Sequence, residues 1–313
     1  VVERHDRTGG LLMYGIPNMK LDKSVVTRRV RLMEELGIEF RLGVDAADPA
    51  VAKALASEFD AVVVAAGACK PRGLGATGFA EGLTSGGVAY AVDYLTSATR
   101  SVLDGGAPAI DAAGKDVVVI GGGDTGNDCL GTAVRQGARS VRQFEFLSCP
   151  PQERAAGDAW PQWPNVKKTD YGQTEAIELM GGEMREWGID TLEVLRGEDG
   201  AVSGLRVVDL DWSHGKPERV EGSEREVPAQ LVLIACGFTG PEKSVFDAFG
   251  VGLAQKGRPL PVMATTASHR AAASIGTTPV FAARDARNGS SLVVSAMADA
   301  LACAAEVAST LKL

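Results

Sequence analysis

Runs of apolar residues that end at or near glycine recur along the chain and predict buried strands. Three of them, at residues 61–68, 117–121 and 230–237, are continuous and rich in valine, alanine or leucine, without polar-apolar alternation. A shorter run at 279–283 is followed by a carboxylate, Asp285. Continuous apolar strands are typical of parallel sheets that are covered on both faces. The pattern therefore predicts an α/β protein.

Helical periodicity occupies the stretches between these strands. Ser24 is placed to cap a helix on which Val26, Val30 and Met33 share a face, and Gly37 ends it. The pattern also predicts a strand with alternating apolar positions at 38–42, a short helix after residue 49, a helix at 90–103, a hairpin at 194–210 and a long alanine-rich helix from 288 to 311.

The run at 117–120 passes directly into Gly121-Gly122-Gly123-Asp124-Thr125-Gly126, with glycines in the order Gly-x-Gly-x-x-Gly. Gly121 permits a tight turn, Gly123 lets the backbone approach a pyrophosphate, and Gly126 lets the next helix pack on the strand. The first N–H groups of that helix then face the anion. The stretch predicts the phosphate-binding turn of a dinucleotide fold.

The residues after this turn support the prediction. A helical face at 129–134 ends near Gly137, and residues 140–147 predict a second strand. On this strand Glu145 lies 19 residues after Gly126, near where an acid that binds a ribose is expected. Because the strand end offers this acid and no arginine pair, the sequence favours NADH over NADPH.

Composition and charge restrict the kinds of molecule that the protein is expected to bind. A length of 313 residues suits two domains, and the net charge of −8 argues against a nucleic-acid backbone or an anionic membrane. The five cysteines stand singly and the three histidines are scattered, so we expect no redox dithiol and no metal site. Free cysteines suit a reducing compartment. No apolar run approaches the roughly 20 residues that span a bilayer.

The first residues look like the end of a second dinucleotide-binding strand whose first strand and helix lie outside the chain. Glu3 is placed to accept hydrogen bonds from ribose hydroxyls. Residues 9–21, including Gly10 and Leu11, combine glycines with large apolar side chains. This combination suits close backbone approach to a flat aromatic ring.

Several motifs together resemble the small subunit, or β region, of glutamate synthase, over nearly the whole chain. Single motifs are generic to flavin disulfide-reductase-like folds, whereas the tryptophan-containing and Asp-Tyr-Gly pieces are specific to the family. The motifs are Glu3-Arg4-His5-Asp6, residues 9–20, residues 66–72, residues 121–130, Trp160-Pro161-Gln162-Trp163-Pro164 and Asp170-Tyr171-Gly172. We expect the two tryptophans to be packing residues, with contact to a cofactor as the alternative.

The resemblance implies two Rossmann-like dinucleotide-binding domains. A nicotinamide domain of residues 73–237 is inserted into an FAD domain made of residues 1–72 and 238–313. It also implies that an iron–sulfur domain and the first strand–helix unit of the FAD domain lie outside this chain, which leaves the FAD site incomplete.

The resemblance assigns cofactor-binding residues but no catalytic acid, base or metal ligand. NADH or NADPH is expected at residues 121–126 and Glu145. The residues expected to bind FAD are Glu3, Gly10, Leu11, Gly67, Gly237, Asp285 and Ser291. The family has glycine before the counterpart of Asp285, whereas this chain has Arg284, which either blocks the flavin or reaches a phosphate.

The function implied is an NAD(P)H-dependent flavin oxidoreductase that passes hydride from NAD(P)H to FAD. In the family, electrons continue through iron–sulfur clusters to FMN in a large subunit, where glutamate is made from glutamine and 2-oxoglutarate. The cytoplasm or the plastid stroma is the expected compartment.

Other functions remain open at this point. One is a non-catalytic nucleotide-binding or subunit-docking module that has lost FAD, which Arg284 favours and the retained Glu3, Gly10 and Asp285 oppose. The absence of Cys-x-x-Cys argues against an enzyme like thioredoxin reductase. The Pro-Gln-Trp-Pro motif argues against one like dihydropyrimidine dehydrogenase.

Overall fold

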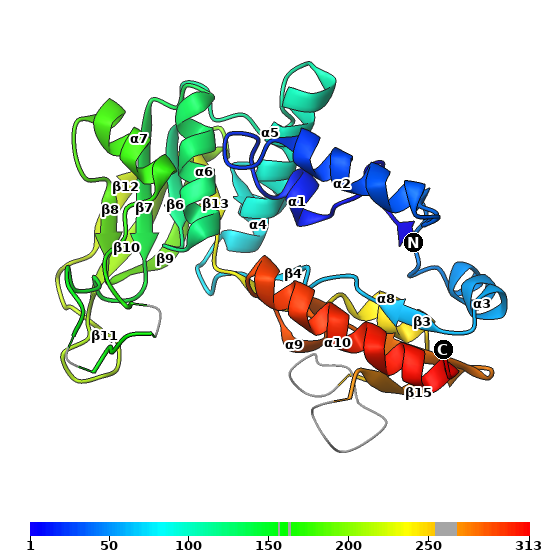
Figure 1. Cartoon of the computed structure of the whole chain (residues 1–313). Helices are drawn as coiled ribbons and strands as arrows, with labels where there is room; N and C mark the ends of the chain where they lie inside the picture. Colours follow the sequence, from blue (N-terminus) through cyan, green and yellow to red (C-terminus); the bar gives the residue numbers. More distant parts are fainter. Residues whose placement is uncertain (156, 162–163, 254–267) are drawn as a thin grey trace. The chain divides into compact units, whose positions relative to one another are not determined.

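The computed structural model describes residues 1–155, 157–161, 164–253 and 268–313, which form two compact units. Unit 1 comprises Val1–Thr8, Thr27–Arg72 and Gly237–Leu313, and unit 2 comprises Gly9–Val26 and Gly73–Cys236 (Figure 1). The predicted α/β class with parallel sheets is confirmed. Residues 9–26 lie early in the chain, yet they pack with unit 2.

A five-stranded parallel sheet forms the centre of unit 2. Its order is β5 (Val88–Tyr90), β13 (Leu231–Ile234), β6 (Asp116–Ile120), β7 (Ser140–Glu145) and β8 (Arg185–Trp187). All four residues of β13 and the last four of β6 are buried, as expected for strands covered on both faces.

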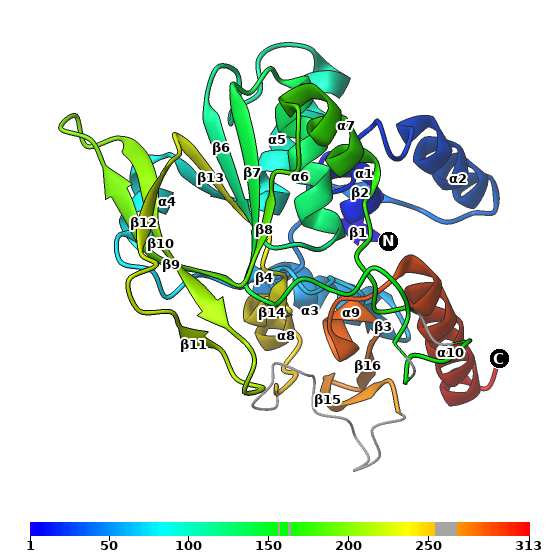
Figure 2. The ribbon, with the colours of Figure 1, turned by 90° about the vertical axis from the view of Figure 1, so that its left-hand side faces the viewer.

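Alternate residues of this sheet face two different layers. Val117 and Val119 pack with α5 (Ala91–Asp104), α6 (Asp124–Arg135) and α7 (Tyr171–Met180). Val118 and Ile120 pack with a second, antiparallel sheet and with α4 (Phe79–Ser85). The second sheet contains β9 (Ile189–Arg196), β10 (Val202–Asp211), β11 (Glu218–Arg219) and β12 (Arg225–Pro228). Figure 2 shows the three layers from the side. The predicted hairpin is β9 and β10, which pair antiparallel.

The early segment of unit 2 contains α1 (Leu11–Tyr14) and the start of α2 (Lys23–Glu35). Helix α2 begins one residue before Ser24, because Asp22 Oδ1 accepts the Ser24 N–H at 2.8 Å. The predicted cap at Ser24 is therefore wrong. Of the predicted apolar face, Val26 is buried and Met33 is exposed.

The described residues of unit 1 form three small sheets. The strands β15 (Arg270–Ile275), β16 (Thr278–Ala282) and β3 (Val62–Val64) form one sheet, in which β16 and β3 run parallel. Parallel β1 (Val2–Glu3) and β2 (Arg41–Leu42) form the second, so the strand predicted at 38–42 is confined to its last two residues. Antiparallel β4 (Lys70–Pro71) and β14 (Phe238–Gly240) form the third.

Helices cover both faces of the sheet that contains β3 and β16. Val280 and Ala282 pack with α3 (Pro49–Glu58) and α8 (Lys243–Ala248), whereas Phe281 packs against Cys303 of α10 (Val293–Leu311). The short helix α9 (Asp285–Asn288) follows β16. The alternation of the buried side chains again matches a strand covered on both sides.

Helix α10 is long and apolar enough, by length and composition, to cross a membrane, and only 6% of it is buried. The expectation that no apolar run approaches the length of a membrane span is therefore wrong for these 19 residues. A single helix of this kind is weak evidence of membrane contact, because helices that pack against protein meet the same criteria.

The family-specific tryptophan motif lies largely at the surface or outside the described residues. Trp160 is 84% exposed, so its predicted packing role is wrong. Gln162 and Trp163 lie outside the described residues, and so do residues 254–267.

Candidate functional site

The Gly-rich turn lies at the point where the strand order of unit 2 reverses. Strand β6 has β13 on one side and β7 on the other, and both are parallel to it. Ligands of open α/β sheets bind outside the carboxyl ends of the strands at such a switch point. The turn at residues 121–126 begins at the carboxyl end of β6, so the fold places it where a ligand is expected.

Two glycines of the turn, Gly121 and Gly126, leave no space for a side chain because backbone lies against them, and a third, Gly122, lies against the movable side chain of Glu145. Gly121 has a φ of 120°, and a Cβ there would lie 2.4 Å from the Ala235 carbonyl oxygen. A Cβ on Gly126 would lie 2.2 Å from the Gly121 carbonyl oxygen, and one on Gly122 would lie 2.2 Å from Glu145 Oε2. Helix α6 therefore starts in direct contact with the end of β6, as predicted for close helix–strand packing.

The fourth glycine is different. Gly123 has an extended backbone, at φ −80° and ψ −176°, and among the described residues no atom lies within 4 Å of where its Cβ would be. It precedes helix α6, and no side chain caps the first N–H groups of that helix. Open space in front of free helix N–H groups fits a pyrophosphate. The chain's own residues therefore fit the phosphate part of a dinucleotide.

Glu145 ends β7 beside this turn. Its carboxylate accepts the Gly122 N–H at 2.5 Å and the Leu147 N–H at 3.3 Å. Glu145, the glycines of the turn, and Asp124 and Thr125 on the first turn of α6 are the residues that the sequence predicts to bind the nicotinamide cofactor. The structure brings this whole group together within unit 2.

A buried glutamine that no sequence motif contains fixes the turn. Gln143, which is 1% exposed, donates from Nε2 to the Gly121 carbonyl oxygen at 2.8 Å. Its Oε1 accepts from Gln173 Nε2 at 3.0 Å. The only signal in the sequence is an uncharged polar residue at an inward position of a predicted buried strand. Such a residue indicates a buried hydrogen-bond partner.

The Asp170-Tyr171-Gly172 motif starts helix α7 against α6. Asp170 caps α7 in a reciprocal capping box with Gln173. A Cβ on Gly172 would lie 2.4 Å from the Asn127 carbonyl oxygen, so the close approach of the two helices requires glycine. The motif therefore positions the helix that carries Gln173, and through it the Gly-rich turn.

In unit 1, three of the residues expected to bind flavin affect one cysteine, Cys69, either by direct contact or by their charge. The charges of Glu3 and Asp285 both act on the Cys69 thiol, whose pKa is raised chiefly by burial. Gly67 has a φ of 76°, and a Cβ there would lie 3.5 Å from Cys69 Sγ. Arg4 joins the same group, because its charge lowers the pKa of the thiol.

Asp285 provides the test of whether unit 1 fits a flavin. Its Oδ1 is buried and accepts no hydrogen bond from the described residues, although Arg284 Nε lies 3.5 Å away. Burial raises the pKa of this carboxyl, and the Ser291 backbone N–H donates to it. The contact of this oxygen with the described residues is thus an ion pair with Arg284 and not a hydrogen bond, which leaves it able to accept one from a hydroxyl of a ligand.

The remaining expected flavin residues are divided between the units. Gly237, with a φ of 76° and open space at its Cβ, belongs to unit 1, and its carbonyl oxygen accepts the Arg72 N–H at 2.9 Å. Gly10 and Leu11 belong to unit 2, where Gly10 has a φ of 51° and Leu11 is exposed.

Arg284 has a backbone conformation that favours glycine. Its φ of 48° and ψ of −119° are nearly the same as those of Gly10, at 51° and −125°, and both residues precede a short helix. The Arg284 N–H donates to Asp299 Oδ2 at 2.7 Å, which holds the turn. A residue with a side chain is strained in this region, at a cost of about 1–3 kcal/mol.

We expect Arg284→Gly to stabilise unit 1 by about 1 kcal/mol. The free energy released by removing the backbone strain exceeds the free-energy cost of the extra backbone freedom that glycine gives to the unfolded chain. Amide hydrogen exchange of β16, which ends two residues earlier, measures the effect. Arg287→Gly, in α9 at ordinary helical geometry, is the control and should destabilise. Equal losses of protection in both variants would contradict the assigned strain.

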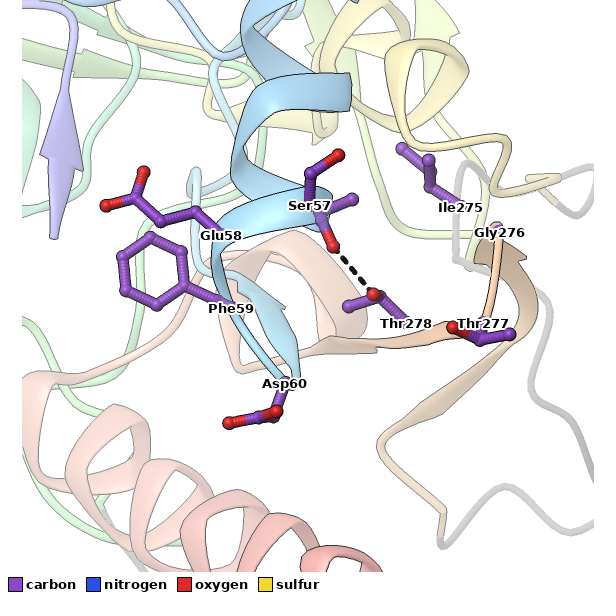
Figure 3. Close-up of a pocket in the computed structure, with 9 residues that line it drawn as sticks. Ser57, Glu58, Phe59, Asp60, Ile275, Gly276, Thr277 and Thr278 are labelled. Atoms are coloured by element: carbon purple, nitrogen blue, oxygen red, sulfur yellow. Dashed lines mark hydrogen bonds between the residues drawn. The ribbon is translucent and has the colours of Figure 1, made fainter.

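An open pocket of about 410 Å³ lies elsewhere in unit 1, lined by residues 56–60 and 275–278 (Figure 3). Thr278 Oγ1 donates across it to the Ala56 carbonyl oxygen at 2.7 Å. Thr278 begins β16, so the pocket lies at the amino end of that strand. Ligands of parallel sheets bind at the carboxyl ends, and we therefore do not assign this pocket to a cofactor.

Two curated relatives align with 98% of the chain at 41% identity. One is the glutamate synthase [NADH] of Schizosaccharomyces pombe, of which the chain covers 14%, and the other is the glutamate synthase [NADPH] small chain of Bacillus subtilis, of which it covers 62%. The chain thus spans about three fifths of the length of that small chain. No family model matches the chain.

The fold is similar to that of a solved oxidoreductase. FprA of Mycobacterium tuberculosis, solved in complex with NADPH, aligns with 99% of this chain and 77% of its own, with a TM-score of 0.68 and 16% identity. At this identity the likeness shows the fold alone.

Proposed function

From the homology of this chain to glutamate synthase small chains over 98% of its length, we propose that it is the part of such a chain that receives electrons from NAD(P)H. In this proposal unit 2 binds the nicotinamide cofactor and unit 1 contributes to an FAD site. The nicotinamide supplies a hydride, which is two electrons and one proton, and the flavin accepts it. The chain is then an oxidoreductase of the glutamate synthase type.

The Gly-rich turn is the observation that carries the proposal. Its open position at Gly123 in front of helix α6, and the Glu145 carboxylate beside it, match what a dinucleotide needs at a switch point. The residues of the turn bind and orient. No side chain of the turn is required to donate or remove a proton, since the cofactors carry the chemistry.

Glu3, Gly67 and Asp285 support the flavin half of the proposal. The charges of Glu3 and Asp285 both act on the Cys69 thiol, which lies beside Gly67, and Asp285 Oδ1 accepts no hydrogen bond from the described residues. We infer that Asp285 accepts a hydrogen bond from the ribityl chain and that Glu3 accepts one from a ribose. The family resemblance assigns these same positions to FAD.

In this proposal, the electrons that reach FAD are used outside this chain. We propose that they pass to a large subunit that carries iron–sulfur clusters and FMN, where glutamine and 2-oxoglutarate yield glutamate. We also propose a reducing compartment, the cytoplasm or the plastid stroma, because Cys69, Cys129, Cys149 and Cys303 are free thiols.

We propose NADH as the preferred donor, because Glu145 is placed to accept from a ribose diol and would repel a 2′-phosphate. In Glu145→Gln, affinity for NADH should fall roughly 10-fold or more, as expected for a lost hydrogen bond to a charged group, while affinity for NADPH should not fall. Titration with each cofactor, followed by tryptophan fluorescence, measures both.

Glu175→Gln is the matched control, since Glu175 forms a partly exposed ion pair with Arg135 in the same unit. It should leave both affinities unchanged. An unchanged ratio of NADH to NADPH affinity in Glu145→Gln would contradict the assignment of Glu145.

A docking module without flavin is the second candidate function, and the side chain of Arg284 favours it. The two candidates differ in one observable. If the purified chain, incubated with FAD, retains no flavin after gel filtration either alone or with Arg284→Gly, the docking module is the better description.

A further inference from the structure

A buried arginine on β8 directs its donors at the start of helix α7. Arg185 is 8% exposed and donates from Nη1 to the Lys168 carbonyl oxygen at 2.6 Å and from Nη2 to Thr169 Oγ1 at 3.0 Å. Its Nε and Nη2 donate to the two carboxylate oxygens of Glu183, both at 2.7 Å. A guanidinium has five N–H donors and no acceptor. An amide side chain beside Arg185 must therefore turn its oxygen towards it.

Gln173, in the first turn of α7, is such an amide. Its Oε1 accepts from Arg185 Nη1 at 3.3 Å and from the Asp170 backbone N–H at 3.0 Å. Because two donors hold this oxygen, the Gln173 NH₂ group is directed at Gln143 Oε1, 3.0 Å away. The Gln143 NH₂ group is then directed at the Gly121 carbonyl oxygen, at 2.8 Å. Arg185, Gln173 and Gln143, called here the amide relay, thus donate in one direction, towards the turn.

The last amide of the relay packs against both ends of the Gly-rich turn. A Cβ on Gly126 would lie 2.5 Å from Gln143 Nε2 and 2.2 Å from the Gly121 carbonyl oxygen. If the Gln143 amide were reversed, its oxygen would face the Gly121 oxygen at the distance of a hydrogen bond. Two buried acceptors that face each other are unfavourable, because neither gains a donor for the water that it lost. The direction of the relay therefore determines whether the turn keeps its hydrogen bond.

An ion pair keeps the first residue of the relay in place. The hydrogen bond from Arg185 lowers the pKa of Glu183 to about 2, so the carboxylate stays charged at neutral pH. Lys167 Nζ lies 2.9 Å from Glu183 Oε2 and adds a second cation. All of these residues belong to unit 2, and neither Arg185 nor the two glutamines are among those that the sequence predicts to bind a cofactor.

We propose that Arg185, acting through the amides of Gln173 and Gln143, positions the Gly-rich turn for the pyrophosphate of the nicotinamide cofactor. The inference rests on the proposed function, in which unit 2 binds this cofactor. The three residues are positioning residues, because they act on the backbone of the turn. The relay should therefore affect NADH, NADPH and ADP-ribose alike, since all three carry the same pyrophosphate.

Gln173→Glu reverses the relay and keeps the shape of the side chain. The carboxylate still accepts from Arg185 and from the Asp170 N–H, but it has no N–H to donate. A charged acceptor attracts an N–H more strongly than a neutral one does, so the Gln143 NH₂ group turns away from Gly121. At about pH 8, where a carboxyl beside a guanidinium is ionised, affinity for all three ligands should fall roughly 10-fold or more. Hydrogen exchange at residues 121–126 should accelerate without any cofactor.

Gln173→Met separates the direction of the relay from the stability of the unit. Methionine loses the bonds to Arg185 and to the Asp170 N–H, so unit 2 should unfold at a lower urea concentration than in Gln173→Glu. Methionine does not attract the Gln143 NH₂ group, however, so the bond to Gly121 remains. Gln173→Met should therefore bind NADH more tightly than Gln173→Glu does. A merely structural role of Gln173 predicts the opposite order, in which affinity follows stability.

Gln230→Glu is the matched control. Gln230 Oε1 also accepts from a backbone N–H, that of Asp116 at 2.9 Å, and from an arginine, Arg139 Nη2 at 3.0 Å. Gln230 precedes β13, at the end of the sheet opposite to the Gly-rich turn. The affinities of this variant, measured by quenching of tryptophan fluorescence, should equal those of the parent.

Unchanged affinity in Gln173→Glu, or affinities of the two Gln173 variants that follow their stabilities, would overturn the proposal. If Gln173→Glu does not fold, NMR of the parent provides the test, because the side-chain amide protons of Gln143 should exchange far more slowly than those of the half-buried Gln230. Equal exchange rates would contradict the relay. If the parent binds none of the three ligands, the proposed function fails, whereas backbone exchange at residues 121–126 still decides whether the relay fixes the turn.

Discussion

Gly121→Ala is expected to destabilise unit 2 by about 3 kcal/mol or more, because two penalties combine at this position. The φ of 120° is unfavourable for a residue with a Cβ, and that Cβ would lie 2.4 Å from the backbone carbonyl oxygen of Ala235. Backbone cannot move aside as a flexible side chain does, so β6 and β13 must separate at their carboxyl ends. Urea unfolding followed by tryptophan fluorescence measures the loss.

The choice of probe follows from the sequence. All four tryptophans lie between Gly73 and Cys236, so their fluorescence reports on unit 2. Gly114→Ala is the matched control, since Gly114 also has a positive φ, of 68°, but has nothing within 4 Å of its Cβ position. It should cost about 1 kcal/mol. Equal losses in the two variants would refute the role given to the contact with Ala235.

Gly123→Ala is expected to leave the stability of unit 2 within about 0.5 kcal/mol of the parent and to weaken NAD(P)H binding roughly 100-fold or more. The backbone at Gly123 is one that alanine adopts, and no atom lies within 4 Å of the new Cβ. The methyl group instead occupies the space in which a pyrophosphate approaches the backbone. Quenching of tryptophan fluorescence by NADH gives the affinity.

Gly75→Ala controls for the loss of a glycine as such. Gly75 is in unit 2, has an ordinary backbone and has open space at its Cβ position. Neither stability nor NADH affinity should change. An NADH affinity of Gly123→Ala equal to that of Gly75→Ala would mean that the turn does not bind the cofactor.

The sequence was sufficient to predict the elements whose pattern is local. The apolar run before Gly121 predicted a strand covered on both faces, and β6 is such a strand. The residues predicted to bind the nicotinamide cofactor, 121–126 and Glu145, lie at one edge of the parallel sheet. They meet there because the turn follows β6 and Glu145 ends the neighbouring parallel strand β7. The resemblance to glutamate synthase small chains is confirmed over 98% of the chain.

Other features depend on contacts that are distant in sequence. The amide of the buried Gln143 forms hydrogen bonds with both Gly121 and Gln173. The residues next to Gln143 in the sequence do not reveal these two partners. The packing of residues 9–26 with unit 2 includes the bond of Lys20 to Asp128, which is 108 residues away, and the contact of Tyr14 with Arg100. The strain at Arg284 likewise appears only as a backbone angle.

Reduction of bound flavin by NADH is the most direct test of the proposed hydride transfer from the nicotinamide at the Gly-rich turn to FAD. The chain is incubated with FAD without oxygen, NADH is added, and the absorbance of oxidised flavin is followed in the parent and in Gly123→Ala. The absorbance should be lost in the parent and persist in the variant at the same NADH concentration. Persistence of oxidised flavin in a parent that has bound FAD, or equal loss in both proteins, would contradict it.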